Sequence, residues 1–418
     1  MNGIVDDYRL NLGGSEYVPI IVGGMGVDIS TAELALEACR LGGIGHISDA
    51  MSMRLADQKF GEKFTKKKTA RYIDTKDLMD KSTVKFDLEH VRRAQYEFVE
   101  SVMMRKQGPG SVFINVMEKL TMGAPADTLR VRLSAAMDAG IEGITLSAGL
   151  HMHSLRLVAD HPRFRDVNFG IIVSSVRALK IFLRGGARVD RLPDYVIVEG
   201  PLAGGHLGFS SEDWHEYRLE DIVAEVLAFL KAESLDIPVI PAGGVFTGTD
   251  AATYLAEGAS AVQVATRFTI TEECGLPSRA KQRYLAAQEE DVCVSEVSST
   301  GYPLRMLRES PCLGSNVAPQ CEPFGYVLDK DGTCLYLDAY EATGVDANGN
   351  KLPVNDRICL CYHFAKMNCY TCGHYVYRLK DTTYQNEDGS YQLLSAEHVF
   401  RDYQYSREHA IALPGRLL

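Results

Sequence analysis

The chain has 418 residues, of which 46% are hydrophobic and 24% charged, and its formal net charge is −11. Such a chain is long enough for one large α/β domain and a smaller second unit, and its acidic balance disfavours a nucleic-acid-binding protein. The sequence shows neither an apolar run of membrane-spanning length nor the apolar core of a secretory leader. We therefore expect a cytoplasmic protein that binds no nucleic acid and no membrane.

Short apolar segments rich in β-branched residues alternate with segments of helix length from residue 18 to residue 310. This alternation predicts an α/β fold of parallel strands connected by helices, and eight such units favour a closed (β/α)8 TIM barrel. The first helix is expected to begin at Ser30 or Thr31 and to end at the glycine pair 42–43. The predicted strands are Val18–Val22, Ile44–Ile47, Val112–Val116, Gly143–Leu146, Phe169–Val173, Tyr195–Val198, Ile237–Ile240 and Ala261–Val264.

A long insertion, at about residues 50–110, separates the second and third predicted strands. It contains the basic run Lys63–Arg71 and a predicted helix over Asp87–Lys106. An insertion after a barrel strand lies on the catalytic face, so this one is expected to act as a lid. We interpret the lysines as a solvated face, and attraction of an acidic or phosphorylated partner is the alternative.

The segment Tyr195–Phe209 runs from a predicted buried strand into the loop GPLAGGHLGF. Gly204 and Gly205 remove side chains just before His206, so the backbone can approach a flat ligand while the imidazole faces it. A polar loop at the carboxyl end of a parallel strand is where α/β proteins place their chemistry. The alternative is an ordinary turn that carries an exposed histidine.

The last two predicted strands each run into a loop suited to a phosphate. Gly243 and Gly244 follow the first of them, and Thr266 and Arg267 follow the second with a hydroxyl and a charge. TIM barrels bind phosphate between the loops after strands seven and eight, through backbone N–H groups. A dinucleotide-binding fold is rejected, because the stretches GGMGVDIS and GGIGHIS both lack the third glycine of its fingerprint.

Seven of the ten cysteines lie beyond residue 310, where the alternation of strands and helices ends. We therefore divide the chain into a barrel at residues 1–310 and a small cysteine-rich C-terminal extension, a domain or a wrapping arm, at residues 311–418. The spacing of Cys359, Cys361, Cys369 and Cys372 predicts a structural zinc site, and an iron–sulfur cluster or unligated thiols are the alternatives. Further candidate ligands are Cys312, Cys321, Cys334, His363 and His374.

A set of motifs, in the same order along the chain, resembles the nitronate monooxygenase family over about residues 15–310. The motifs are GGMGVDIS, FINVM, SAG, EGPLAGGHLG, IPAGGVF and QVATRF. Members of this family are FMN-bound TIM barrels, and their relatives include flavin-dependent enoyl-acyl-carrier-protein reductases and NADH:quinone reductases. The resemblance therefore implies an FMN-dependent oxidoreductase.

The resemblance also implies roles for individual residues. His206 would be the catalytic or substrate-orienting histidine, and Asn115 would hydrogen-bond the flavin. Ser147, at the end of the fourth predicted strand, is a candidate donor to the substrate, with capping of the next helix as the alternative. The residues expected to lie against the flavin ring are Gly24, Met25, Glu199 and Gly204, and those expected to hold its phosphate end are Gly243, Gly244, Gln263, Val264, Ala265 and Thr266.

The leading hypothesis for the reaction is oxidation of small alkyl nitronates with O₂, with His206 as a base or as an anchor for the anion. Glu199 departs from many family members, which carry glutamine there, and a carboxylate at this place would disfavour an anionic nitronate. The alternative is an NAD(P)H-dependent reductase of a quinone or of an enoyl thioester, with an acyl carrier protein as partner. A non-catalytic flavin- or phosphate-binding subunit is a third hypothesis, and a homo-oligomer remains open.

Overall fold

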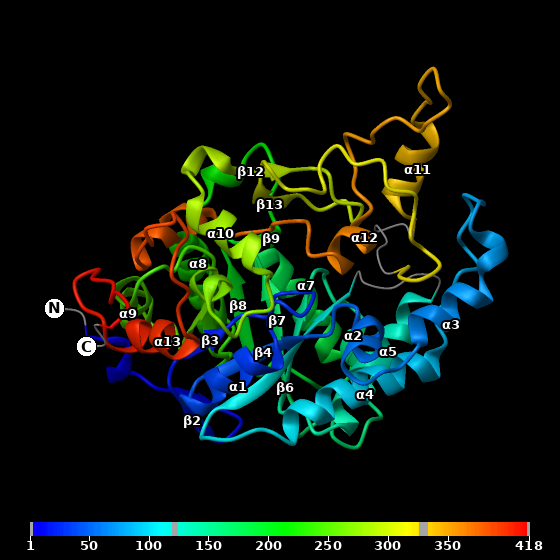
Figure 1. The fold of residues 1–418 in the computed structure, drawn as a ribbon. Coiled ribbons are helices and arrows are strands. Elements are labelled where there is room, and N and C mark those ends of the chain that lie inside the picture. The colour runs from blue at the N-terminus through cyan, green and yellow to red at the C-terminus, as the bar shows by residue number, and fades with distance from the viewer. Residues whose placement is uncertain (1–2, 119–123, 326–332, 416–418) are drawn as a thin grey trace.

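The computed structural model describes residues 3–118, 124–325 and 333–415. Its centre is a closed barrel of eight parallel strands, in which each strand pairs with the next and the last pairs with the first (Figure 1). Each barrel strand contains residues of one predicted strand, so the predicted TIM barrel is confirmed. The barrel strands are β3 (Ile20–Val22), β4 (Ile44–Ser48), β5 (Ser111–Met117), β6 (Gly143–Ser147), β7 (Asn168–Val173), β8 (Tyr195–Glu199), β10 (Val239–Ala242) and β11 (Val262–Val264).

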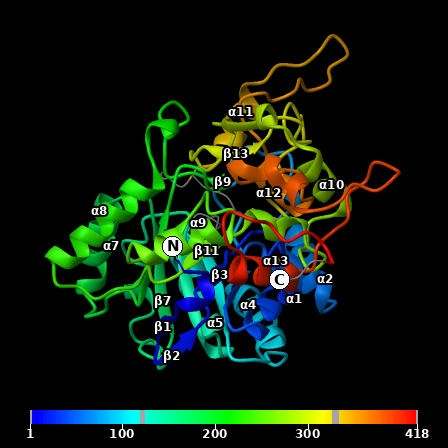
Figure 2. The same cartoon turned by 90° about the vertical axis from the view of Figure 1, so that its left-hand side faces the viewer.

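Helices surround the barrel and connect its strands (Figures 1 and 2). Among the described residues, none of the helices is long and apolar enough to cross a membrane. The helices between barrel strands are α1 (Ala32–Arg40), α2 (Ser52–Lys59), α3 (Phe64–Arg71), α4 (Leu88–Met103), α5 (Pro125–Asp138), α6 (Ser154–Leu157), α7 (Val176–Ala187), α8 (Leu219–Ala232) and α9 (Gly248–Ala256).

The start of α1 uses both of the predicted capping residues. Thr31 is the N-cap, because its Oγ1 accepts a hydrogen bond from the N–H of Leu34 at 3.0 Å. Ser30 instead closes the turn between β3 and α1, where its hydroxyl accepts from the N–H of Met25 at 2.8 Å and donates to the carbonyl of Gly23 at 2.9 Å. This serine therefore fixes the glycine-rich turn at the carboxyl end of β3.

Alternate residues of the barrel strands point inward, as the two-residue period of a strand requires. Near the amino ends these side chains are mostly apolar, and the rings of Phe113 and Tyr195 stack with their centroids 5.7 Å apart. His46 lies in the same core, with Nδ1 3.0 Å from the carbonyl of Val22 and Nε2 2.6 Å from Oγ1 of Thr145. Burial lowers the pKa of His46 to about 4, so its imidazole is neutral at pH 7.

The amino end of the barrel is covered by a short antiparallel hairpin of β1 (Leu10–Leu12) and β2 (Ser15–Tyr17). Leu10, Leu12 and Tyr17 are buried in the same apolar cluster as the inward residues of the strands. The hydroxyl of Tyr17 is 3.0 Å from Oγ of Ser111, at the start of β5. This end of the barrel is therefore packed closed, which leaves the carboxyl end for a site.

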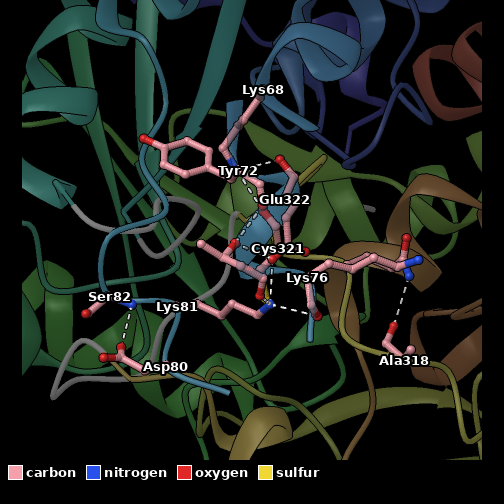
Figure 3. A network of polar contacts seen from close by, with 11 residues as sticks. Lys68, Tyr72, Lys76, Asp80, Lys81, Ser82, Ala318, Cys321 and Glu322 are labelled. Carbon is pink, nitrogen blue, oxygen red and sulfur yellow. Dashed lines mark hydrogen bonds and ion pairs between the residues drawn. The ribbon is translucent and has the colours of Figure 1, made fainter. Parts of the chain in front are cut away.

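The insertion after β4 has two parts. One part is a helix in the ring around the barrel, and the other contacts the C-terminal part of the chain. The helix predicted over Asp87–Lys106 is confirmed as α4, which packs against α2 and α5 in the ring around the barrel. The basic run forms α3, but Lys68 does not face solvent. Its Nζ is buried and donates hydrogen bonds to the carbonyl oxygens of Cys321, at 2.6 Å, and Glu322, at 2.9 Å (Figure 3). The predicted solvated face is thus wrong for Lys68.

A buried ion pair joins the same two parts of the chain. Nζ of Lys81 lies 2.5 Å from Oε1 of Glu322, and their side chains are 2% and 5% exposed. Thr75 donates its hydroxyl to the same carboxylate at 2.9 Å. Burial raises the pKa of Glu322, but the hydrogen bonds from Lys81 and Thr75 outweigh it and hold this pKa below its ordinary value. We call the contacts of Lys68, Thr75 and Lys81 with Cys321 and Glu322 the clasp, and Figure 3 labels Lys68, Lys81, Cys321 and Glu322.

The chain after β11 covers two sides of the barrel. A three-stranded antiparallel sheet, in the order β12, β13, β9, stands beside the carboxyl end, and α12 lies above the same end (Figure 1). The last helix packs against α1 and α9 on the side of the barrel (Figures 1 and 2). Strand β9 (Gly205–His206) precedes β10 in the chain. The elements after β11 are α10 (Ser278–Ala286), β12 (Val292–Ser295), β13 (Leu304–Leu307), α11 (Leu335–Ala342), α12 (Leu360–Ala365) and α13 (Ala396–Tyr405).

Candidate active site

The carboxyl ends of the barrel strands enclose a cavity of about 370 Å³. This is the end at which TIM barrels carry their sites. Apart from Arg267, every residue that the sequence assigned to a flavin, to its phosphate or to a substrate lies in the wall of this one cavity, and their individual roles remain predictions. The residues are Gly24, Met25, Asn115, Ser147, Glu199, Gly204, His206, Gly243, Gly244, Gln263, Val264, Ala265 and Thr266.

One wall of the cavity is built where β3, β5 and β6 end. Asn115 points inward from β5, and its Oδ1 accepts the hydroxyl hydrogen of Ser147 at 2.5 Å. This bond leaves the amide N–H groups of Asn115 for a ligand, whereas the hydroxyl hydrogen of Ser147 is already used. Gly24 packs so closely here that a Cβ on it would lie 2.3 Å from Cβ of Asn115. Only glycine fits at this position, and the wall is flat as a result.

The opposite end of the cavity is lined by the loops after β10 and β11. Gly243 and Gly244 have φ angles of 86° and 104°, a conformation that glycine adopts without strain. Oε1 of Gln263 is buried and has no hydrogen-bond partner among the residues that the structure describes. A buried acceptor without a donor costs about 1–3 kcal/mol, so this atom suits an N–H group of a ligand. The cavity thus has a flat wall at Gly24, an unpaired acceptor on Gln263, and backbone N–H groups at Gly243 and Gly244. These features fit a flavin ring and its phosphate.

Arg267 does not take part in this phosphate end, in contrast to the prediction. Its guanidinium is fully buried and lies 2.6 Å from Oδ2 of Asp402 in α13, as an ion pair without good hydrogen-bond angles. Cζ of Arg267 lies 5.8 Å from the ring centroid of Phe246 and 5.1 Å from that of Tyr403. The side chain therefore points out of the barrel and attaches α13 to it.

Glu199 ends β8 and faces the cavity because it shares the inward side of the strand with residues 195 and 197. Burial raises its pKa to about 7, and the positive charge of Arg305 opposes that rise. Arg305 is itself fully buried and donates from Nη1 to the carbonyls of Pro201, at 2.5 Å, and Ala203, at 2.7 Å. Its guanidinium lies 4.4 Å from the ring centroid of Trp214. Near pH 7, Glu199 thus carries much less than a full negative charge.

His206 is held by the sheet beside the barrel, because β9 pairs with β13 and brings His206 opposite Leu304. Its Nε2 lies 3.2 Å from Oγ of Ser298. The rings of Tyr302 and Phe364 meet the imidazole edge-on, with centroids 6.4 and 6.5 Å away. Burial lowers the pKa of His206 to about 4, so the imidazole is neutral at pH 7 and cannot anchor an anion by charge.

The C-terminal part of the chain supplies a wall that the sequence did not predict. Gly373 approaches so closely that a Cβ on it would lie 2.3 Å from Oγ1 of Thr266. A Cβ on Gly204 would lie 2.6 Å from the backbone of Cys372 and Gly373. The residues of this wall that line the cavity are Tyr302, Leu304, Phe364, Thr371, Cys372 and Gly373. Gly204 and Gly373 are the residues that allow this close packing, and they were the feature of the sequence from which the wall could have been predicted.

The predicted zinc site is not formed. Cys372 lies in the cavity wall, whereas Cys369 is hydrogen-bonded to Cys312. In the described part of the chain, no group of three or more His, Cys, Asp or Glu side chains could hold a metal ion. Cys321 and Cys334 also lie near Cys359 and Cys361, and Cys369 lies near Cys359.

The closed barrel and the cavity at its carboxyl end have the form of a TIM barrel with its site at the usual end. Comparison with protein families agrees, because the model described as nitronate monooxygenase matches residues 14–330. The chain therefore belongs to this family.

The individual relatives are more distant and match only in part. The (3aS,4S,5R,7aS)-5-hydroxy-7a-methyl-1-oxo-octahydro-1H-indene-4-carboxyl-CoA dehydrogenase of Rhodococcus jostii is 36% identical over 114 residues, which are 27% of this chain and 29% of the relative. A nitronate monooxygenase of Paraburkholderia phytofirmans is 36% identical over 151 residues, which are 36% of this chain and 40% of the relative. The chain thus spans less than half the length of either relative.

A solved structure shows the same fold over nearly the whole chain. Nitroalkane oxidase from Streptomyces ansochromogenes is 18% identical, with a TM-score of 0.53, and the match covers 92% of this chain and 94% of that chain. At this identity the likeness concerns the fold alone. The comparison therefore supports the arrangement of barrel and C-terminal part without assigning a substrate.

Proposed function

We propose that this protein oxidises alkyl nitronates with O₂, using FMN bound in the cavity. The observation that carries the proposal is the low negative charge of the cavity wall. Glu199 is the one carboxylate among the described lining residues, and its pKa is raised to about 7 by burial. The expected repulsion between this carboxylate and an anionic nitronate is therefore weakened at neutral pH.

The chain offers a place for each part of FMN. The phosphate would be held by N–H groups of the loops at Gly243, Gly244 and Thr266, and the ring would lie against Gly24 with Asn115 as its donor. When bound, the flavin supplies the redox chemistry, since it can take electrons from a nitronate and give them to O₂. The protein's contribution is to exclude water and to hold the substrate in place.

The substrate would lie between the flavin position and His206. The neutral imidazole can make one hydrogen bond to a nitro oxygen, and the rings of Tyr302 and Phe364 beside it suit the alkyl part. Such a small apolar pocket with one polar contact is typical of sites for small organic ligands.

Reduction of an enoyl thioester or a quinone by NAD(P)H is the second candidate. One relative is named as a dehydrogenase of a carboxyl-CoA compound. In the sequence, a glutamate at position 199 favours this reductase hypothesis over nitronate oxidation. In this case the substrate would be larger and would extend out of the cavity, to coenzyme A or to an acyl carrier protein.

Anaerobic mixing of the FMN-loaded protein distinguishes the two candidates. We expect preformed ethyl nitronate to bleach the flavin absorbance within the time of one turnover, and NADH or NADPH to leave it unchanged. Bleaching by NAD(P)H but not by the nitronate would reject the proposal in favour of the second candidate. Failure to take up FMN at all would reject both.

A further inference from the structure

A chain of hydrogen bonds runs from His206 into the buried turn after β12. Nε2 of His206 lies 3.2 Å from Oγ of Ser298, which lies 2.7 Å from Oγ1 of Thr300. The N–H of Thr300 donates to Oγ of Ser298 at 3.2 Å, and the N–H of Tyr302 donates to Oγ1 of Thr300 at 3.2 Å. Ser298 and Thr300 are 0% and 3% exposed, so both side chains are shielded from bulk solvent.

Two arrangements of the hydroxyl hydrogens are compatible with these distances. In the first, Thr300 donates its hydroxyl to Ser298, and Ser298 donates its hydroxyl to Nε2 of His206. Every hydrogen in the chain then has an acceptor. In the second, Nε2–H of His206 donates to Ser298, and Ser298 donates to Thr300. The hydroxyl hydrogen of Thr300 is then left without an acceptor among the described residues.

The first arrangement is favoured, because a buried hydroxyl hydrogen without an acceptor loses its hydration and gains nothing in return. In this arrangement Nε2 of His206 is an acceptor, and the ring hydrogen of the neutral imidazole is on Nδ1. Nδ1 of His206 has no partner among the described residues and is not fully buried. Since His206 lines the cavity, Nδ1–H is the group that a substrate would meet.

We propose that Ser298 and Thr300 are positioning residues that hold His206 as a neutral Nδ1–H donor, so the site accepts a substrate that is already an anion. A nitronate oxygen can accept this hydrogen bond directly. A neutral nitroalkane would first have to lose a C–H proton to a base, but the lone pair of the imidazole, on Nε2, already accepts the hydroxyl hydrogen of Ser298. The inference rests on the proposed nitronate oxidation and names the ionisation state of its substrate.

The tautomer of His206 is measurable without any turnover. In ¹⁵N-histidine-labelled protein with FMN bound, two-dimensional NMR distinguishes protonated from unprotonated ring nitrogens, and loss of signals in His206→Asn identifies those of His206. We expect a protonated Nδ1 and an unprotonated Nε2 at pH 7. A protonated Nε2 in the wild type would overturn the proposal.

The neighbouring serine provides a matched control for mutation. Ser299 is 1% exposed, its hydroxyl has no hydrogen-bond partner in the described chain, and it does not line the cavity. In Ser298→Ala we expect the ring hydrogen of His206 to redistribute towards Nε2 and kcat/KM for ethyl nitronate to fall about tenfold, as for loss of one buried hydrogen bond. In Ser299→Ala both quantities should stay as in the wild type. An unchanged tautomer in Ser298→Ala would overturn the role of Ser298.

A comparison of two forms of one substrate completes the test. We expect preformed ethyl nitronate to reduce the bound flavin at least a hundredfold faster than neutral nitroethane, added before it ionises, at the same concentration and pH. Equal rates would mean that the site contains a competent base, and this result would overturn the inference while leaving nitronate oxidation intact. Absence of reduction by either form, with the Nδ1–H tautomer present, would instead reject the proposed function.

Discussion

Removing the carboxylate of the clasp should release the insertion from the C-terminal part of the chain. In Glu322→Gln, Lys81 keeps its charge, loses its ionic partner and remains in a site where its side chain is 2% exposed. Breaking a buried ion pair in this way costs about 3–5 kcal/mol. Because about 1.4 kcal/mol corresponds to a factor of ten, amide hydrogen exchange in α3 should become about a hundredfold faster or more.

The control for this experiment is an exposed ion pair. Glu309 lies 3.2 Å from Arg283, and their side chains are 68% and 62% exposed, so Glu309→Gln should change stability by about 0–1 kcal/mol. The double variant Lys81→Met, Glu322→Leu removes both buried charges and should recover most of the protection in α3. If α3 exchanges in Glu322→Gln as slowly as in the wild type, the clasp does not hold it and the reasoning is refuted.

Three further outcomes concern the cavity and the barrel core. Because Glu199 ionises near pH 7, the KM for a preformed nitronate should rise between about pH 6 and about pH 9 in the wild type. In Glu199→Gln the KM should stay flat over this range. A flat profile in the wild type would contradict the placement of an ionising Glu199 beside the substrate. Gly204→Ala should raise the Kd for FMN in a titration. The new Cβ would lie 2.6 Å from the backbone of Cys372 and Gly373, at a cost of about 1–3 kcal/mol. An unchanged Kd would argue against this packing. His46 and His206 have folded-state pKa values of about 4, so the folded chain binds fewer protons than the unfolded chain between about pH 6.5 and about pH 4. The urea midpoint should therefore fall as the pH is lowered through this interval, and a rise would count against it.

The barrel and most of the cavity could be predicted because they depend on local patterns. Each strand is a short apolar run, and the two-residue period predicts which residues in its carboxyl-terminal half point inward. Asn115, Glu199 and Gln263 follow this rule, and all three face the cavity. Glycine positions such as Gly24 and Gly243 add close backbone approaches that can be recognised in the sequence.

The remaining features depend on contacts between distant segments. Arg267 follows a barrel strand as a phosphate ligand would, but its charge is taken up by Asp402, which is far along the chain. The cysteine spacing fits a zinc site, yet spacing does not determine whether thiols face one point, and Cys372 turns to the cavity. Ser298, the partner of His206, comes close only because β9 pairs with β13 outside the barrel. No local pattern carries this information.

The close contact between Gly373 and Thr266 has a consequence for the order of events during synthesis. Thr266 completes the barrel side of the cavity, whereas Gly373 is made roughly a hundred residues later. At about 5–20 residues per second, the nascent chain spends on the order of ten seconds with a finished barrel and an open cavity. During this interval a flavin can enter from the side that the C-terminal part later covers. The growing chain thus has a wider entry route to the cavity than the completed chain.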